Sequence, residues 1–181
     1  MKRNRTLIAI IAAALIPAIP VSTAMSKTLV PRSLKQESDR AERGEAQDHE
    51  KRVRMKDLPA AVQRTVREQS RGAAIRGLSQ ETENGKTNYE AELRVNGHNR
   101  DVLIDPSGAV VEIEEQVTLA SLPPAVKKTI EQKAGGGRVG IVESITKGDA
   151  VVAFEAHLRK AGKSLEIKVS PDGQLIAQGR D

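Results

Sequence analysis

The 181-residue chain contains no cysteine and no tryptophan, and it has one phenylalanine and one tyrosine. Without cysteine there can be no disulfide bonds and no thiolate metal sites, so a folded unit must be held by its apolar core. The scarcity of aromatic residues removes the stacking platforms on which single-strand nucleic-acid binders depend. The composition therefore predicts no nucleic-acid partner and no cysteine-bound cofactor.

Long apolar runs are missing except near the N-terminus. Three basic residues among the first five precede an apolar run at 7–21, and Ser22-Thr23-Ala24 follows it. This order is typical of a secretory signal peptide, which we predict at residues 1–24 with cleavage after Ala24. An uncleaved anchor is the alternative, although the run is short for a membrane span and contains two prolines. We expect a secreted or periplasmic protein with no stable membrane span after cleavage.

The net charge is small once the signal peptide is set aside. Without Lys2, Arg3 and Arg5, the formal net charge of +5 falls to +2, which is too little to attract nucleic acid. Residues 57–116 carry a net charge of −4, whereas residues 117–181 carry +3. This difference could orient a partner, could help the two parts dock, or could be a solvated surface without function.

Residues 25–52 differ in composition from the rest of the chain. Charges of both signs alternate there, and apolar residues are almost absent after Leu34. Such a segment buries too little surface to offset the entropy lost on ordering, so we predict a disordered linker. The alternative is a tether that holds the folded part away from a membrane or a partner.

The remaining sequence states one pattern twice. Val-x-Met-x-x-Leu-Pro-x-Ala-Val-x-x-Thr-Val begins at Val53, and its counterpart, with Leu at the third position and Ile at the last, begins 64 positions later at Val117. After one inserted residue, Tyr89-Glu-Ala corresponds to Phe154-Glu-Ala at a spacing of 65. Agreement over this length predicts two tandem repeats, at residues 53–116 and 117–181.

Each repeat changes its apolar period from helical to strand-like. Asp57 and Ser121 are expected N-caps of a helix with apolar residues at helical spacing. Alternating apolar and charged residues then predict strands, separated by turns such as Asn96-Gly97. The predicted fold class is α+β, with two tandem repeats of one helix packed on a four-stranded antiparallel meander sheet. Phe154 and Tyr89 are expected to occupy equivalent core positions.

These residues resemble the PepSY-like domains of exported bacterial proteins. The resemblance rests on the Leu-Pro-opened helix, the aromatic-Glu strand, and the hairpins Asp105-Pro-Ser-Gly and Ser170-Pro-Asp-Gly. The resemblance extends over residues 53–181. PepSY-like domains are in turn similar in fold to the tandem-repeat beta-lactamase inhibitory proteins. The resemblance implies a non-catalytic binding or inhibitory module that associates with peptidases or envelope proteins. Those inhibitors carry disulfides and interface aromatics, which this chain lacks, so no inhibitor residues are transferred.

No catalytic or metal-binding constellation is visible in the sequence. The three histidines, His49, His98 and His157, have no ligand spacing and are interpreted as surface residues. Asp105 and Asp172 lie in turns too short to supply the oxygen ligands of calcium. We therefore predict no catalytic residues, no metal site and no cofactor, and the sequence does not identify a binding surface.

The functional prediction is a non-catalytic module that binds another protein in the cell envelope or outside the cell. The expected partner is an exported peptidase or an envelope protein, and its identity cannot be read from the sequence. A peptidase or hydrolase inhibitor and a structural envelope protein are the two alternatives.

Overall fold

The fold is described by a computed structural model that places residues 49–83 and 85–179. The described strands form one antiparallel sheet, in which strands consecutive in sequence are neighbours from β1 to β9. The strands are β1 (His49–Arg52), β2 (Ala74–Glu83), β3 (Lys86–Val95), β4 (His98–Ile104), β5 (Val110–Val117), β6 (Arg138–Lys147), β7 (Ala150–Lys160), β8 (Lys163–Val169) and β9 (Leu175–Gly179). The helices are η1 (Met55–Asp57), α2 (Ala60–Gln69), η2 (Leu119–Ser121) and α3 (Pro124–Ala134).

The predicted fold class, with a separate four-stranded sheet in each repeat, is wrong. Strands β5 and β6 pair with each other, from Ile113 opposite Thr146 to Val117 opposite Val142, and join all strands into one nine-stranded sheet. Two separate sheets would leave β5 and β6 as open edges with unpaired backbone groups. Pairing these two edges satisfies those groups.

The first strand lies in a segment predicted to be disordered. The last four residues of the predicted linker, His49–Arg52, form β1, with Glu50 opposite Glu81 and Arg52 opposite Ser79. These four residues are ordered because their backbone groups pair with β2, and the composition of the segment does not indicate this pairing. The rest of the linker and the signal peptide predicted at 1–24 lie outside the described residues.

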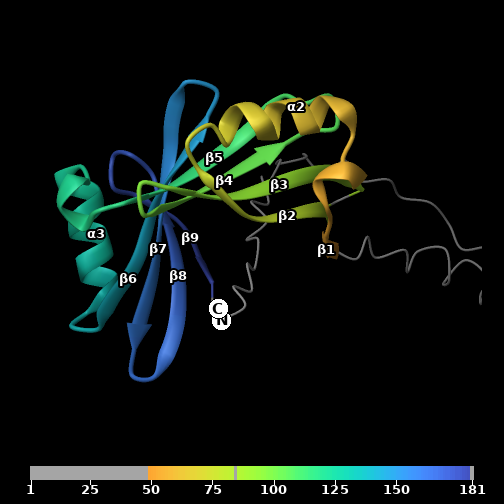
Figure 1. Ribbon diagram of the computed structural model, residues 1–181. Coiled ribbons are helices and arrows are strands. Elements are labelled where there is room, and N and C mark those ends of the chain that lie inside the picture. Colours follow the sequence, from red (N-terminus) through yellow and green to blue (C-terminus); the bar gives the residue numbers. More distant parts are fainter. Residues whose placement is uncertain (1–48, 84, 180–181) are drawn as a thin grey trace, which may run out of the picture.

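Both α-helices pack on the same face of the sheet (Figure 1). On β5, Ile113 packs against the core beneath α2, and Val117 packs against the core beneath α3. Residues four positions apart on a strand point to the same side, so the two cores share a face. The first core comprises Leu58, Val62, Val66, Leu78, Ala91, Leu93, Val102 and Ile104. The second comprises Leu122, Val126, Ile130, Ala134, Val142, Phe154, Ala156, Leu158, Ile167 and Val169.

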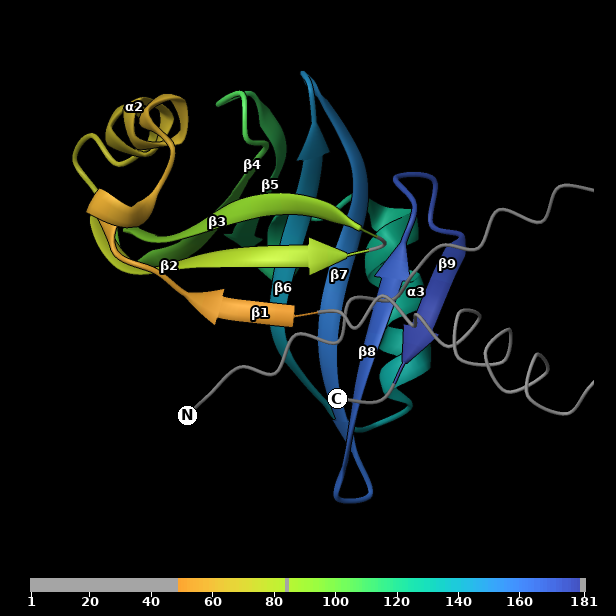
Figure 2. The ribbon, with the colours of Figure 1, turned by 90° about the vertical axis from the view of Figure 1, so that its right-hand side faces the viewer.

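The sheet is strongly twisted along its length. Figure 2 shows β2 and β3 running across the direction of β7 and β8. Register shifts interrupt the ladders between Leu103 and Ile104 and between Ile145 and Thr146, and such bulges increase local twist. We call the side opposite the two helices the helix-free face.

The predicted N-caps are wrong. Asp57 and Ser121 lie in the 3-10 helices η1 and η2, and both α-helices instead begin immediately after a proline N-cap, Pro59 or Pro123. Proline disfavours helical backbone in the residue before it, so Leu58 is extended and separates η1 from α2. Asp57 accepts a hydrogen bond from the Arg54 Nε atom at 2.7 Å.

Each helix is fastened to a hairpin in its own half of the chain. The Thr65 hydroxyl donates a hydrogen bond of 2.6 Å to the carbonyl of Gly108, and Thr129 makes the same bond to Gly173. Ala61 lies under the first of these hairpins, where its small side chain permits the close approach. The contact explains why alanine and threonine occupy the apolar stripe of the helix.

We expect the β4–β5 hairpin to lose stability in acid. The Ser107 hydroxyl and the backbone amides of Ala109 and Ser107 donate hydrogen bonds to Asp105 and lower its pKa from 3.8. A carboxylate whose pKa is lowered by folding stabilises the fold above its unfolded pKa, and this contribution disappears as pH falls through the folded pKa. In urea unfolding, the stability difference between the wild type and Asp105→Asn should shrink below about pH 3.8.

The same experiment can be repeated independently at Asp172, in the hairpin between β8 and β9. The Ser170 hydroxyl holds the pKa of Asp172 below 3.8, so Asp172→Asn should show the same pH dependence. A stability difference that is unchanged between pH 7 and pH 2.5 for both variants would contradict the prediction.

Candidate functional site

The most unusual feature of the helix-free face is a row of buried carboxylates. Each of the strands β3 to β8 contributes one acidic residue that is at most 9% exposed, and among the described residues no lysine, arginine or histidine is buried to this extent. We call this row the acidic stripe; it consists of Glu90, Asp101, Glu114, Glu143, Glu155 and Glu166. Strand alternation and register place all six opposite the helices.

Basic side chains around the stripe offset part of its charge. Lys168 Nζ lies 3.4 Å from Glu155 Oε2, and its side chain is itself only 18% exposed. Away from the stripe, Lys147 pairs with Glu112 at 2.8 Å. Buried carboxylates are costly unless they are paired or hydrogen-bonded, so these cations stabilise the charged face.

A third ion pair lies in the first half of the face, between β1 and β3. Arg52 Nη2 lies 2.9 Å from Glu92 Oε1, and the guanidinium passes directly over Gly77. A Cβ atom at Gly77 would lie 1.8 Å from Arg52 Nη1. The absence of a side chain at Gly77 therefore allows Arg52 on β1 to reach across β2 and pair with Glu92 on β3.

Next to this contact the surface is hollowed. The hollow has a volume of about 460 Å³ and is lined by Arg76, Glu92, Leu93, Arg94, Asn99 and Asp101. Charges of both signs and an amide line it, and Leu93 is the one apolar residue of its lining. Pockets for small organic ligands are mostly apolar, so this hollow fits a polar side chain of a partner better than a small ligand.

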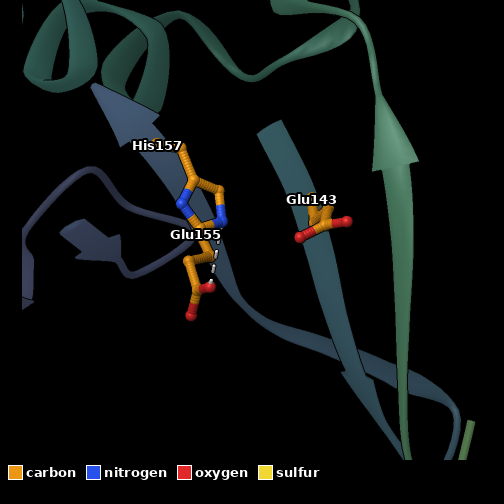
Figure 3. Close-up of side chains that lie close together, drawn as sticks. All are labelled: Glu143, Glu155 and His157. Carbon is orange, nitrogen blue, oxygen red and sulfur yellow. Dashed lines mark ion pairs between the residues drawn. The ribbon is translucent and has the colours of Figure 1, made fainter. Parts of the chain in front are cut away.

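Two carboxylates of the stripe, Glu143 and Glu155, form a group of potential metal ligands with His157 (Figure 3). Glu143 on β6 is directly opposite Glu155 on β7, and His157 follows Glu155 by two residues on the same strand. One ligand atom from each residue lies within 4.8 Å of the others. His157 Nε2 is 3.9 Å from Glu155 Oε1, while Glu143 and Glu155 are 2% and 8% exposed.

The histidines and turn aspartates considered in the sequence analysis lie in different parts of the structure. Asp105 and Asp172 lie in exposed turns, where hydrogen bonds within each turn explain them. His98 is exposed at the start of β4. The interpretation of His157 as a surface residue is incomplete, because it is half-buried and lies beside the two buried carboxylates Glu143 and Glu155. Its separation by two residues from Glu155 is the signal for a shared strand face, whereas Glu143 joins the group only through the register.

Within 49–83 and 85–179, no helix is long and apolar enough to span a bilayer.

The fold resembles several solved structures of Bacteroides proteins. A candidate periplasmic protein from Bacteroides eggerthii matches with a TM-score of 0.57 at 20% identity, covering 68% of this chain and 88% of that one. A DUF2874 family protein from Bacteroides uniformis matches with a TM-score of 0.55 at 21% identity, covering 68% and 89%. A BLIP-like protein from Bacteroides fragilis matches with a TM-score of 0.51 at 18% identity, covering 68% and 86%.

At these identities the likeness establishes the fold alone. No protein-family profile matches the sequence, and no curated protein is significantly similar to it.

Proposed function

We propose that this chain is an exported, non-catalytic binding module whose helix-free face receives a basic segment of another exported protein. The acidic stripe carries this proposal, because it gathers one carboxylate from each of six adjacent strands beneath the same face of the sheet. Complementary charge steers association and excludes partners of the wrong sign. A Lys- or Arg-rich loop or extended segment has the charge and the length to follow the row.

Three further observations support the proposal. The structural neighbours include candidate periplasmic proteins and a BLIP-like protein, which agrees with export and with a binding role. The sequence contains a predicted signal peptide. The scarcity of tryptophan and tyrosine, which commonly anchor tight interfaces, favours an electrostatic interface of modest affinity.

The test compares charge reversals on the two faces of the molecule. Glu81→Lys with Glu92→Lys changes partly exposed positions on the helix-free face, and Glu68→Lys with Glu131→Lys changes exposed positions on the two helices. Cross-linking to exported proteins of the producing cell should yield one basic partner. Its affinity should fall at least tenfold for the first double variant and decline steeply with salt, because interface charges act largely through such steering.

The helix variant should bind this partner like the wild type. Equal loss of binding in both double variants, or salt-independent binding, would overturn the basic-segment proposal. Inhibition of a peptidase by the wild type and not by the face variant would identify the module as an inhibitor. Turnover of peptide, ester or beta-lactam substrates that is abolished by Glu90→Gln or Glu155→Gln would disprove a non-catalytic role.

A further inference from the structure

The group of Glu143, Glu155 and His157 has the composition of a metal-binding site as well as of a charged surface. Two carboxylates and one imidazole come from adjacent strands and converge to within 4.8 Å of one another. Opposed residues on paired strands, together with a residue two positions along, form a compact triangle on one sheet face. From this convergence we propose that Glu143, Glu155 and His157 bind one divalent transition-metal ion of the zinc class.

The ligand types select among metals. Calcium requires more oxygen ligands than this group offers, and magnesium is bound by oxygen and makes no use of an imidazole nitrogen. Zinc accepts imidazole nitrogen together with carboxylate oxygen, and sites with three protein ligands complete the coordination with water. His157 therefore makes a first-row transition ion the better match for this site.

The surroundings favour a cation at this position. Glu143 is 2% exposed and Glu155 is 8% exposed, so their charges are shielded from bulk water and interact strongly with a nearby ion. A divalent ion placed between them would offset both charges. His157 is more accessible than either carboxylate, which leaves a route for the ion to enter.

Lys168 acts as an outer contact for the proposed site. It pairs with Glu155 Oε2 at 3.4 Å, whereas Oε1 is the oxygen that faces His157 at 3.9 Å. Glu155 could thus bind an ion through Oε1 and keep its pairing with Lys168 through Oε2. Carboxylate ligands are commonly held by a second partner in this way, which fixes their orientation.

Zinc itself is the probe for the test, and the protein is the full mature chain after treatment with a chelator. Isothermal titration should detect one zinc ion per chain. His157→Ala and, separately, the isosteric Glu143→Gln should each weaken binding at least tenfold. His98→Ala removes an exposed histidine elsewhere on the sheet and should leave the affinity unchanged.

Two readouts separate loss of the site from loss of the fold. Circular dichroism should show that Glu143→Gln is folded without metal. Histidine-selective NMR should show a zinc-dependent shift of the His157 ring and none for His98. The proposal is wrong if the wild type binds no stoichiometric zinc, or if His157→Ala and Glu143→Gln bind zinc as tightly as the wild type. Zinc binding that shifts only another histidine would also overturn it.

Discussion

Phe154→Ala is expected to destabilise the second half of the sheet by about 3 to 5 kcal/mol, the range for truncating a buried phenylalanine. Phe154 is 8% exposed and belongs to the core beneath α3. Truncation removes its burial and leaves a cavity that the surrounding residues fill only in part. Urea unfolding at neutral pH measures the loss, which is a large fraction of the stability of a domain of this size.

Val152, two positions before Phe154 on the same strand, supplies a matched control. Val152 on β7 is 38% exposed, and a register shift between Val151 and Ala153 displaces it from the core alternation. Val152→Ala should therefore change stability by no more than about 0.5 kcal/mol, as for most surface substitutions. Similar losses in Phe154→Ala and Val152→Ala would disprove the assignment of Phe154 to the core.

The expected equivalence of Phe154 and Tyr89 is confirmed. Phe154 lies opposite Val169, and Tyr89 lies opposite Ile104, one residue before the hairpin turn in each case. Tyr89 packs against the core beneath α2, as Phe154 packs in the core beneath α3. The repeat and the period-two alternation predict this result, because the side on which a side chain lies follows from its position along the strand wherever no bulge intervenes.

The sheet architecture could not be predicted in the same way. Whether Val117 and Val142 face each other across β5 and β6 depends on a pairing between two segments separated by α3. Local periodicity reports the presence of strands and not their partners, and both separate and joined sheets satisfy the same alternation. The need to cover strand edges decides between them.

The group of Glu143, Glu155 and His157 could not be predicted from local sequence either. Alternation places Glu155 and His157 on the polar side of β7, and the sequence predicts His157 to be a surface residue. The register brings Glu143 opposite Glu155, and both are buried. Polar alternation identifies the side of a sheet opposite the core, but burial on that side depends on twist and on neighbouring side chains that local sequence does not specify.

Gly173→Ala is expected to have a comparably large effect, because it combines backbone strain with a collision. Gly173 has a φ of +89°, a conformation that costs a residue with a side chain about 1 to 3 kcal/mol. An added Cβ would lie 2.8 Å from the backbone of Ala125 on α3, and overpacking of this kind costs roughly 1 to 3 kcal/mol more. It would also displace the carbonyl that accepts the Thr129 hydrogen bond.

Gly162→Ala isolates the backbone contribution. Gly162 has a φ of +75°, and a Cβ there meets no atom within 4 Å. We therefore expect Gly162→Ala to lose only the strain component, about 1 to 3 kcal/mol, and Gly173→Ala to lose measurably more in the same urea experiment. The added loss should diminish when Ala125 is replaced by glycine, since the Cβ of Ala125 also lies 2.8 Å from the added atom. Equal losses at the two glycines would show that α3 does not approach the β8–β9 hairpin closely, and the proposed fastening of helix to hairpin would then be incorrect.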